Sequence, residues 1–192
     1  MNVLIIGAEG FIGKNLYQRL KNFREYKLFK IIKSTPHNRF VTLIKNADVI
    51  FHLAGANREK NINNFKKKNY IFTKQICEVL KKKNKKTKLI FTSTSHINKK
   101  TSYGISKKKS EQELIKISKK YIDLYIYRLT NIFGKWSKPF YNSVVATFCY
   151  QIANNKKIDI LNNEKIKFVY INDLINNFIK IIKKNNIKKV FQ

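Results

Sequence analysis

The stretch NVLIIGAEGFIG, residues 2–13, decides the fold class of this 192-residue chain. Its apolar beginning, 2–7, is typical of a buried strand, and the residues after it begin a helix that we expect to extend to about Leu20. Gly7, Gly10 and Gly13 stand between strand and helix with GxxGxxG spacing. Glycines there permit a tight turn and a close backbone approach to a pyrophosphate, while the helix N-terminus offers unpaired N–H groups. The stretch therefore predicts a strand, a phosphate-binding loop and a helix.

Short apolar runs alternate with helical stretches along the rest of the chain. Further strands are expected at 27–33, 48–55, 88–95 and 123–129, and helices at 38–46, 65–83 and 103–121. Hydrophobic residues make up 43% of the chain, which argues against disorder. Near-continuous apolar strands separated by helices indicate a parallel sheet covered on both faces. The predicted fold class is therefore α/β, a Rossmann-like doubly wound parallel sheet with helices on both faces.

The charge balance is strongly basic, with 41 Lys+Arg against 11 Asp+Glu and a formal net charge of +30. Taken alone, this predicts a protein that binds nucleic acid. The basic residues are nearly all lysine, however, and they are spread from end to end beside abundant Asn, Ile and Phe. These are the residues of AT-rich codons, so coding bias is the preferred explanation, and a surface that binds polyanions such as RNA stays open as the alternative. We expect the lysine runs to be solvated surface, and nucleic acid is not the expected partner.

Cysteine usage and the chain's apolar runs indicate the compartment. Cys77 and Cys149 lie far apart and lack metal-ligand spacing, so we expect no metal site and two thiols packed as small hydrophobes in a reducing environment. The N-terminus has no basic leader or cleavage site, and no apolar run approaches the roughly 20 residues of a membrane span. These features predict a soluble, cytoplasmic protein with no membrane partner.

A second chemical signal follows the expected strand at 88–95. FTSTS, residues 91–95, places hydroxyl groups at the carboxyl end of that strand, where doubly wound sheets bind ligands. Tyr103 and Lys107 begin the next helix one turn apart, about 6 Å along its axis, so both can face one cleft. A nearby ammonium and a positively charged cofactor ring would lower the tyrosine pKa, so that the phenol can exchange a proton with a substrate oxygen. A strand-end hydroxyl would polarise the same carbonyl, and the hydride would come from the cofactor.

The end of the second strand distinguishes the two nicotinamide dinucleotides. Basic residues there accept a 2′-phosphate, whereas an acidic residue binds the ribose 2′-hydroxyl. IIKST (31–35) contains Lys33 and no carboxylate, and Arg39 lies a little further on. NADP is therefore the expected cofactor. NAD stays open because Glu9, in the glycine loop, would repel a 2′-phosphate, and because Lys33 can equally be one more surface lysine.

In their order along the chain, these segments resemble the extended short-chain dehydrogenases/reductases of the NAD-dependent epimerase/dehydratase family. GAEGFIG (7–13) matches the loop motif, HLAG (52–55) the motif after the fourth strand, and YGISK (103–107) the Tyr-x-x-x-Lys dyad. RLTNIFG (128–134) resembles an RxxNxYG-like segment, and FVYINDL (168–174) a later motif containing an aspartate, here Asp173.

The resemblance implies roles for named residues. Thr94, Tyr103 and Lys107 would be catalytic, with Ser93 and Ser95 as alternates to Thr94. Lys107 would also hold the cofactor ribose. The residues that would contact the cofactor are Gly7, Gly10, Phe11, Ile12, Gly13, Lys33, Leu53, Ala54, Gly55, Tyr103 and Lys107.

Three segments are similar to the reductase domain of bifunctional capsule and O-antigen enzymes: residues 131–158, HLAGANR (52–58) and the short SYG connection before the tyrosine. In that family a reductase is fused to a cupin, which epimerises C3 of a UDP-2-acetamido-2,6-dideoxy-4-hexulose. The reductase then reduces the C4 ketone with NADPH. The resemblance implies this reduction here, with a UDP-sugar substrate and with a homodimer left open. The substrate would lie near Asn131, Lys138, Tyr141 and Asn142.

The chain also departs from that family. It ends at Gln192, before the remaining sugar-nucleotide subdomain and before any cupin, and the segment after the second strand is compressed. We therefore expect a single domain, 1–192, with a cofactor-binding core at 1–130 and a partial substrate-binding region at 131–192. Two alternatives stay open: an NAD-dependent nucleotide-sugar epimerase or dehydratase, and a truncated, inactive dinucleotide-binding remnant. A dehydratase ranks lower because an acidic residue usually follows the catalytic Thr, where this chain has Ser95.

For other singled-out residues the structural interpretation is the stronger one. His52 is expected to be positional, and Asp173 to be an N-cap of the helix that follows. For Asn131, by contrast, a turn cap is the weaker alternative to the substrate-side role. Trp136 and the aromatic residues in 140–150 are expected to pack or to form a partner surface.

Overall fold

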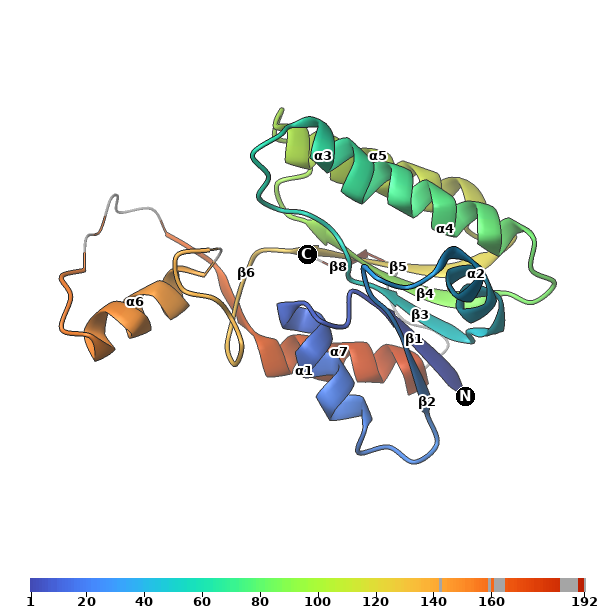
Figure 1. The fold of residues 1–192 in the computed structure, drawn as a ribbon, viewed down its shortest axis with the longest axis horizontal. Coiled ribbons are helices and arrows are strands. Elements are labelled where there is room, and N and C mark those ends of the chain that lie inside the picture. The colour runs from blue at the N-terminus through green and yellow to red at the C-terminus, as the bar shows by residue number, and fades with distance from the viewer. Residues whose placement is uncertain (142, 159, 161–164, 184–189, 192) are drawn as a thin grey trace.

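A computed structural model of the protein describes residues 1–141, 143–158, 160, 165–183 and 190–191. It shows three layers, with helices on both faces of one central sheet (Figure 1). The strands of that sheet are β1 (Asn2–Ile6), β2 (Lys27–Ile31), β3 (Val49–His52), β4 (Thr87–Thr94), β5 (Ile122–Leu129) and β8 (Val190–Phe191). The fold confirms the predicted α/β class.

The central sheet is parallel throughout, in the order β2-β1-β3-β4-β5-β8. Its register pairs Val3 with Leu28 on one side and with Val49 on the other. The strand order reverses at β1, because β2 and β3 lie on opposite sides of it. In open α/β sheets such a reversal places a ligand-binding crevice at the carboxyl ends of the strands.

The alternating direction of the side chains along the strands divides the core into two clusters. Val3 and Ile5 pack with α1 (Phe11–Leu20) and α7 (Ile171–Lys183), whereas Leu4 and Ile6 pack against the opposite helices. Those opposite helices are α2 (His37–Asn46), α4 (Phe72–Lys81) and α5 (Ser102–Ile117). Because successive strand side chains point to opposite faces, a strand apolar at every position is buried on both sides.

The expected helix at 65–83 has an unexpected internal turn. It begins as α3 (Asn63–Phe65), continues as the π-helical turn η1 (Lys66–Ile71) and ends as α4. A π-turn adds a residue to the helical repeat and often marks a functional site. Here it contains the buried Asn69, which faces the loop after β3.

The segment after β5 leaves the sheet and returns to it. β6 (Asn131–Phe133) and β7 (Phe168–Tyr170) form a two-stranded parallel sheet, and α6 (Val144–Ala153) projects away from the main body (Figure 1). The chain then re-enters the core through α7 and β8. Within 131–192, therefore, β8 adds a strand to the main sheet and α7 packs against one face of it. The elements β6, α6 and β7 form the arm outside the sheet.

Some structural expectations need correction. The exposed Cys149 lies on α6, so only Cys77 is packed as a small hydrophobe. Asp173 is the third residue of α7 and not its N-cap, although an acidic residue in the first turn still suits the helix dipole. Trp136, Phe140, Tyr141 and Tyr150 are all at least 40% exposed, so of their two expected roles core packing does not hold and a partner surface stays a prediction.

Candidate active site

The glycine loop joins β1 to α1 with the geometry that its spacing predicts. Gly7 has φ of +92°, and a Cβ there would lie 2.7 Å from the backbone nitrogen of Ala54. A Cβ on Gly13 would lie 2.2 Å from the carbonyl oxygen of Gly7. Gly10 precedes the helix as its N-cap, and no side chain caps the free N–H groups. The loop therefore presents bare backbone donors at a helix N-terminus, which is the arrangement that binds a pyrophosphate.

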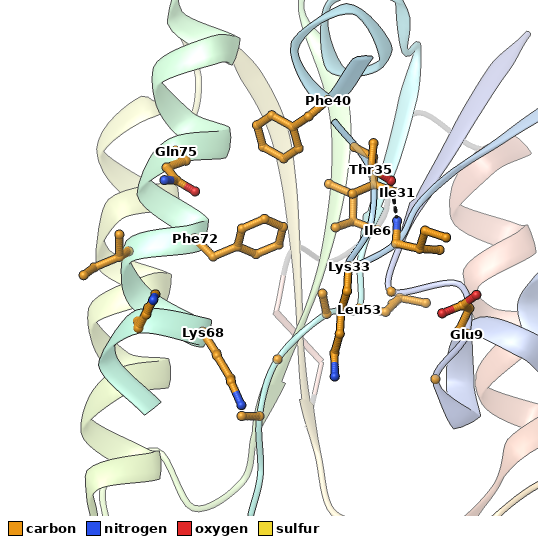
Figure 2. A pocket seen from close by; sticks show the side chains of 18 of the residues that line it. Ile6, Glu9, Ile31, Lys33, Thr35, Phe40, Leu53, Lys68, Phe72 and Gln75 are labelled. Atoms are coloured by element: carbon orange, nitrogen blue, oxygen red, sulfur yellow. Dashed lines mark hydrogen bonds between the residues drawn. The ribbon is translucent and has the colours of Figure 1, made fainter. Parts of the chain in front are cut away.

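A cavity of about 690 Å³ opens beside this loop, at the carboxyl ends of β1, β2 and β3. Figure 2 shows its apolar end, where Phe40 and Phe72 approach each other with ring centroids 5.8 Å apart. The opposite end carries charged side chains, among them Lys33 and Lys68. Of the expected cofactor-binding residues, the cavity is lined by Gly7, Gly10, Lys33, Leu53, Ala54 and Gly55.

The cavity and loop fit a dinucleotide. An apolar slot suits a base, bare glycine N–H groups suit phosphates, and lysines suit an additional anionic group. At Gly55, which lines the cavity, a Cβ would lie 3.6 Å from Nζ of Lys107, so this glycine stands between the cavity and the dyad lysine. Phe11 and Ile12 instead lie in the first turn of α1, where their side chains pack against the core.

Thr94 and Tyr103 come together at the carboxyl end of β4. Thr94 is the last residue of that strand and is buried, and its Oγ1 accepts a hydrogen bond from the backbone N–H of His96 over 3.1 Å. A side-chain hydrogen bond links Thr94 to the Tyr103 phenol and lowers the tyrosine pKa. Burial acts more strongly and raises the pKa of Tyr103 above its ordinary value. The two alternates to Thr94 differ in exposure. Ser93 is buried within β4, and Ser95 is exposed just beyond it.

Lys107 is a buried lysine in a chain whose other lysines are mostly solvated. Its side chain is 4% exposed, its Nζ donates to the carbonyl oxygen of Thr92 over 2.6 Å, and the ammonium lies 4.1 Å from the ring centroid of Phe91. Burial lowers the pKa of Lys107 to about 7, and Glu111, one turn along α5, opposes that shift. The neighbouring Lys108 and Lys109 are exposed, as expected for surface lysines.

In the protein alone, Lys107 does not lower the pKa of Tyr103. We expect the ammonium and the cofactor ring together to lower it, whereas without cofactor the pKa of Tyr103 is raised, and burial is the leading cause. Lys107 points at the Thr92 carbonyl, and its own charge is weakened near neutral pH. Tyr103 is therefore a neutral phenol at pH 7, ready to donate a proton.

Asn69 is a site residue that sequence reasoning missed. Its Oδ1 accepts from the N–H of Ala56 over 2.7 Å, and its Nδ2 donates to the carbonyl of Ala56 and to Oγ of Ser106. It thereby ties the loop after β3 to α5, directly beside Lys107. The asparagine stands in a run of lysines and asparagines without any distinguishing pattern, so only the π-turn that aims it inward reveals it.

His52 is structural, as expected. It is fully buried, and its Nε2 is 2.9 Å from Oγ1 of Thr73. Burial, with a smaller contribution from the charge of Lys107, lowers its pKa to about 3. A histidine that stays neutral over the whole physiological range supports the end of β3 and does not exchange protons.

The expected substrate residues lie in or near the arm, at different places. Tyr141 lines the large cavity, and the guanidinium of Arg58 stands 5.8 Å from its ring centroid. Asn131 is exposed at the start of β6, where its Nδ2 donates to the carbonyl of Lys167 over 3.5 Å, and Lys138 is exposed. Asn142 lies outside the described residues. The structure thus places Tyr141 against the cavity and does not bring Asn131 and Lys138 to its lining.

Two further features are absent from the described part of the chain. It contains no group of three or more His, Cys, Asp or Glu side chains able to hold a metal ion. None of its helices is long and apolar enough to cross a lipid bilayer.

Comparison with known proteins places these features in context. A family model described as the NAD dependent epimerase/dehydratase family matches residues 3–192. The UDP-2-acetamido-2,6-beta-L-arabino-hexul-4-ose reductase of Pseudomonas aeruginosa is 36% identical over 184 residues, covering 95% of this chain and 50% of the relative. The chain thus spans about half the length of this curated relative.

Solved structures agree with the sequence comparison. The capsular polysaccharide assembling protein CapF from Staphylococcus aureus matches with a TM-score of 0.86 and 34% identity, over 99% of this chain and 53% of that one. The UDP-glucuronic acid 4-epimerase from Bacillus cereus, solved in complex with NAD, matches with a TM-score of 0.84 over 99% of this chain and 76% of that one. Its identity is 24%, so this second likeness shows the fold alone.

Proposed function

The chain belongs to the NAD dependent epimerase/dehydratase family, and on that premise we propose that it reduces the C4 ketone of a UDP-2-acetamido-2,6-dideoxy-hexulose with NADPH. The observation that carries the proposal is that Thr94 and Tyr103 are hydrogen-bonded at the end of β4, while Lys107 of the same helix as Tyr103 lies beside Gly55 of the glycine-loop cavity. The Pseudomonas aeruginosa relative, a reductase of a UDP-hexul-4-ose by name, supports this choice of substrate.

Each residue of the site has a distinct task in this reduction. When bound, the nicotinamide dinucleotide would supply the hydride. The Tyr103 phenol, kept neutral by burial, donates its proton to the C4 oxygen as charge develops there. The Thr94 hydroxyl, at the strand end, donates to the same oxygen and orients the ketone. Lys107, whose Nζ lies beside Gly55 of the cavity lining, would hold the ribose of the cofactor.

The cofactor would lie along the cavity, with its pyrophosphate on the bare N–H groups of 10–13 and its adenosine in the slot beside Phe40 and Phe72. Lys33 supports NADPH over NADH, since it lies at the charged end of that cavity. We further propose Tyr141 as a residue at the boundary between cofactor and sugar nucleotide. Asn131, Lys138 and Asn142 stay predictions, as do a cytoplasmic location and a homodimer.

An NAD-dependent epimerase is the second candidate, and one observation favours it. Glu9 lines the same cavity as Lys33, and a carboxylate disfavours a 2′-phosphate. An epimerase retains its cofactor and consumes no NADPH over a full turnover. An inactive remnant is the third candidate, and it would at most bind dinucleotide, seen as a raised unfolding midpoint in its presence.

The deciding experiment mixes the purified chain with NADPH and UDP-2-acetamido-2,6-dideoxy-4-hexulose and follows NADPH absorbance and product mass. The proposal expects one NADPH oxidised for each sugar reduced. Sugar interconversion without NADPH consumption would establish the epimerase instead. Dinucleotide binding without any sugar turnover would indicate a remnant.

A further inference from the structure

Two lysines from different elements reach the same end of the large cavity. Lys33 follows β2, Lys68 belongs to η1, and both are exposed and line the cavity. Figure 2 shows the two side chains extending toward the same end, away from the apolar end marked by Phe40. This convergence brings together positive charge from two walls of one cavity.

A carboxylate of the same cavity, Glu59, pairs with Lys68. Oε1 of Glu59 lies 2.6 Å from Nζ of Lys68, and Oε2 accepts from Nδ2 of Asn64 over 3.1 Å. The pKa of Glu59 is lowered, first by its hydrogen bond to Lys68, and the charge of Lys33 contributes to the same shift. Glu59 is therefore ion-paired with Lys68, and it lines the same cavity as both lysines.

We propose that Lys33 and Lys68 jointly bind the 2′-phosphate of NADPH, and that Glu59 is the internal anion that occupies Lys68 until the phosphate replaces it. The inference rests on the proposed use of NADPH. It goes beyond that proposal because it names Lys68 and Glu59 as determinants of the choice between NADPH and NADH.

Charge explains the exchange. A phosphate monoester carries about −1.5 to −2 charges at pH 7 and three acceptor oxygens, so it can bind two ammonium groups at once, whereas one carboxylate carries a single charge. Glu59 must give up Lys68 when the phosphate enters, and its remaining charge then repels the phosphate. Lys33 and Lys68 stand on different walls of the cavity, and both act on the phosphate. Removal of either lysine therefore weakens the binding of NADPH and not that of NADH. Because the group is partly solvated, the effect weakens with added salt.

The test compares NADPH and NADH binding by fluorescence titration of the purified chain at low and at moderate salt. Lys68→Met removes the second cation, and Glu59→Gln removes the internal anion while keeping its shape. Lys66→Met is the matched control, because Lys66 is an exposed lysine of the same π-turn and does not line the cavity.

Lys68→Met is expected to weaken NADPH binding about tenfold and to change NADH binding less than about twofold, the size of one partly solvated charge-assisted contact. Glu59→Gln is expected to strengthen NADPH binding about threefold or more and to leave the affinity for NADH unchanged. Lys66→Met should change neither.

The contrary outcomes separate the two proposals. If Lys68→Met weakens both dinucleotides equally, or if Glu59→Gln weakens NADPH, the inference is overturned although the chain still uses NADPH. A wild type that prefers NADH overturns the inference and the choice of NADPH. A wild type that binds neither dinucleotide overturns the proposed function as well.

Discussion

The Nζ of Lys107 donates a hydrogen bond to the carbonyl oxygen of Thr92 over 2.6 Å, inside a site where the lysine is 4% exposed. This pairing satisfies one of its three donors, and Phe91 faces the ammonium at 4.1 Å. Since charging an amine there is costly, burial lowers the pKa of Lys107 to about 7. The lysine of the Tyr103–Lys107 pair is thus close to half-charged at neutral pH.

The first prediction concerns stability against pH for Lys107→Met. Below pH 7 the lysine is protonated in both the folded and the unfolded chain, so its burial destabilises the fold by a constant amount. Between its folded pKa of about 7 and its ordinary value of 10.5, the unfolded chain binds the extra proton, so wild-type stability rises with pH. The stability of the Met variant relative to wild type should therefore fall by roughly 2 to 3 kcal/mol between about pH 7 and pH 9.

Urea unfolding at each pH measures that difference. Lys108→Met is the control, because Lys108 is exposed on the same helix, and its difference from wild type should stay constant with pH. A constant difference for Lys107→Met as well would show that Lys107 titrates near its ordinary pKa.

The second prediction compares two glycines of the phosphate loop. A Cβ on Gly13 would lie 2.2 Å from the carbonyl oxygen of Gly7, whereas a Cβ on Gly10 would meet that same oxygen at 3.3 Å. Gly13→Ala should therefore destabilise the fold by about 2 kcal/mol or more, and Gly10→Ala by less than about 1 kcal/mol. Thermal and urea unfolding check the order, and equal losses would contradict the packing of α1 against the loop.

The third prediction concerns Asn69. Asn69→Ala removes three hydrogen bonds of a buried side chain and leaves the N–H and carbonyl of Ala56 unpaired. We expect a loss of about 1 to 3 kcal/mol in unfolding free energy, with weaker dinucleotide binding because the loop after β3 loses its anchor. The exposed Asn63→Ala, on the preceding turn, should change stability by less than about 0.5 kcal/mol. If the two variants behave alike, Asn69 does not anchor the loop.

The sequence was most informative where local pattern and chemistry coincide. Strand 2–7, the three glycines and the Tyr103–Lys107 spacing indicated the fold and the family, and both are confirmed. These signals are strong because a buried parallel strand and a tight phosphate turn each allow few residue types.

Other features depend on contacts between distant segments and left no local signal. Asn69 meets Ser106 only after the sheet brings their elements together, and Glu59 meets Lys68 only because the loop after β3 folds back onto η1. The lowered pKa of Lys107 and the raised pKa of Tyr103 follow from burial, which the spacing of the two residues does not reveal. A lysine-rich composition also hides functional lysines among solvated ones.

The last prediction tests Tyr103 as the proton donor. Tyr103→Phe keeps the ring and removes the hydroxyl, so kcat for reduction should fall about 10²- to 10⁴-fold while NADPH binding and the folded state persist. Tyr26→Phe, remote from the site before β2, is the control and should leave kcat unchanged.

The most direct measurement follows deuterium from NADPH labelled at the transferred position of its nicotinamide to the sugar nucleotide, with wild type and Tyr103→Phe side by side. Mass spectrometry and NMR should find the label at C4 of the sugar with wild type, and a rate lower by about two orders of magnitude or more with Tyr103→Phe. Equal transfer by both proteins, or a folded wild type that binds NADPH and leaves the 4-keto sugar unlabelled, would contradict the proposed reduction.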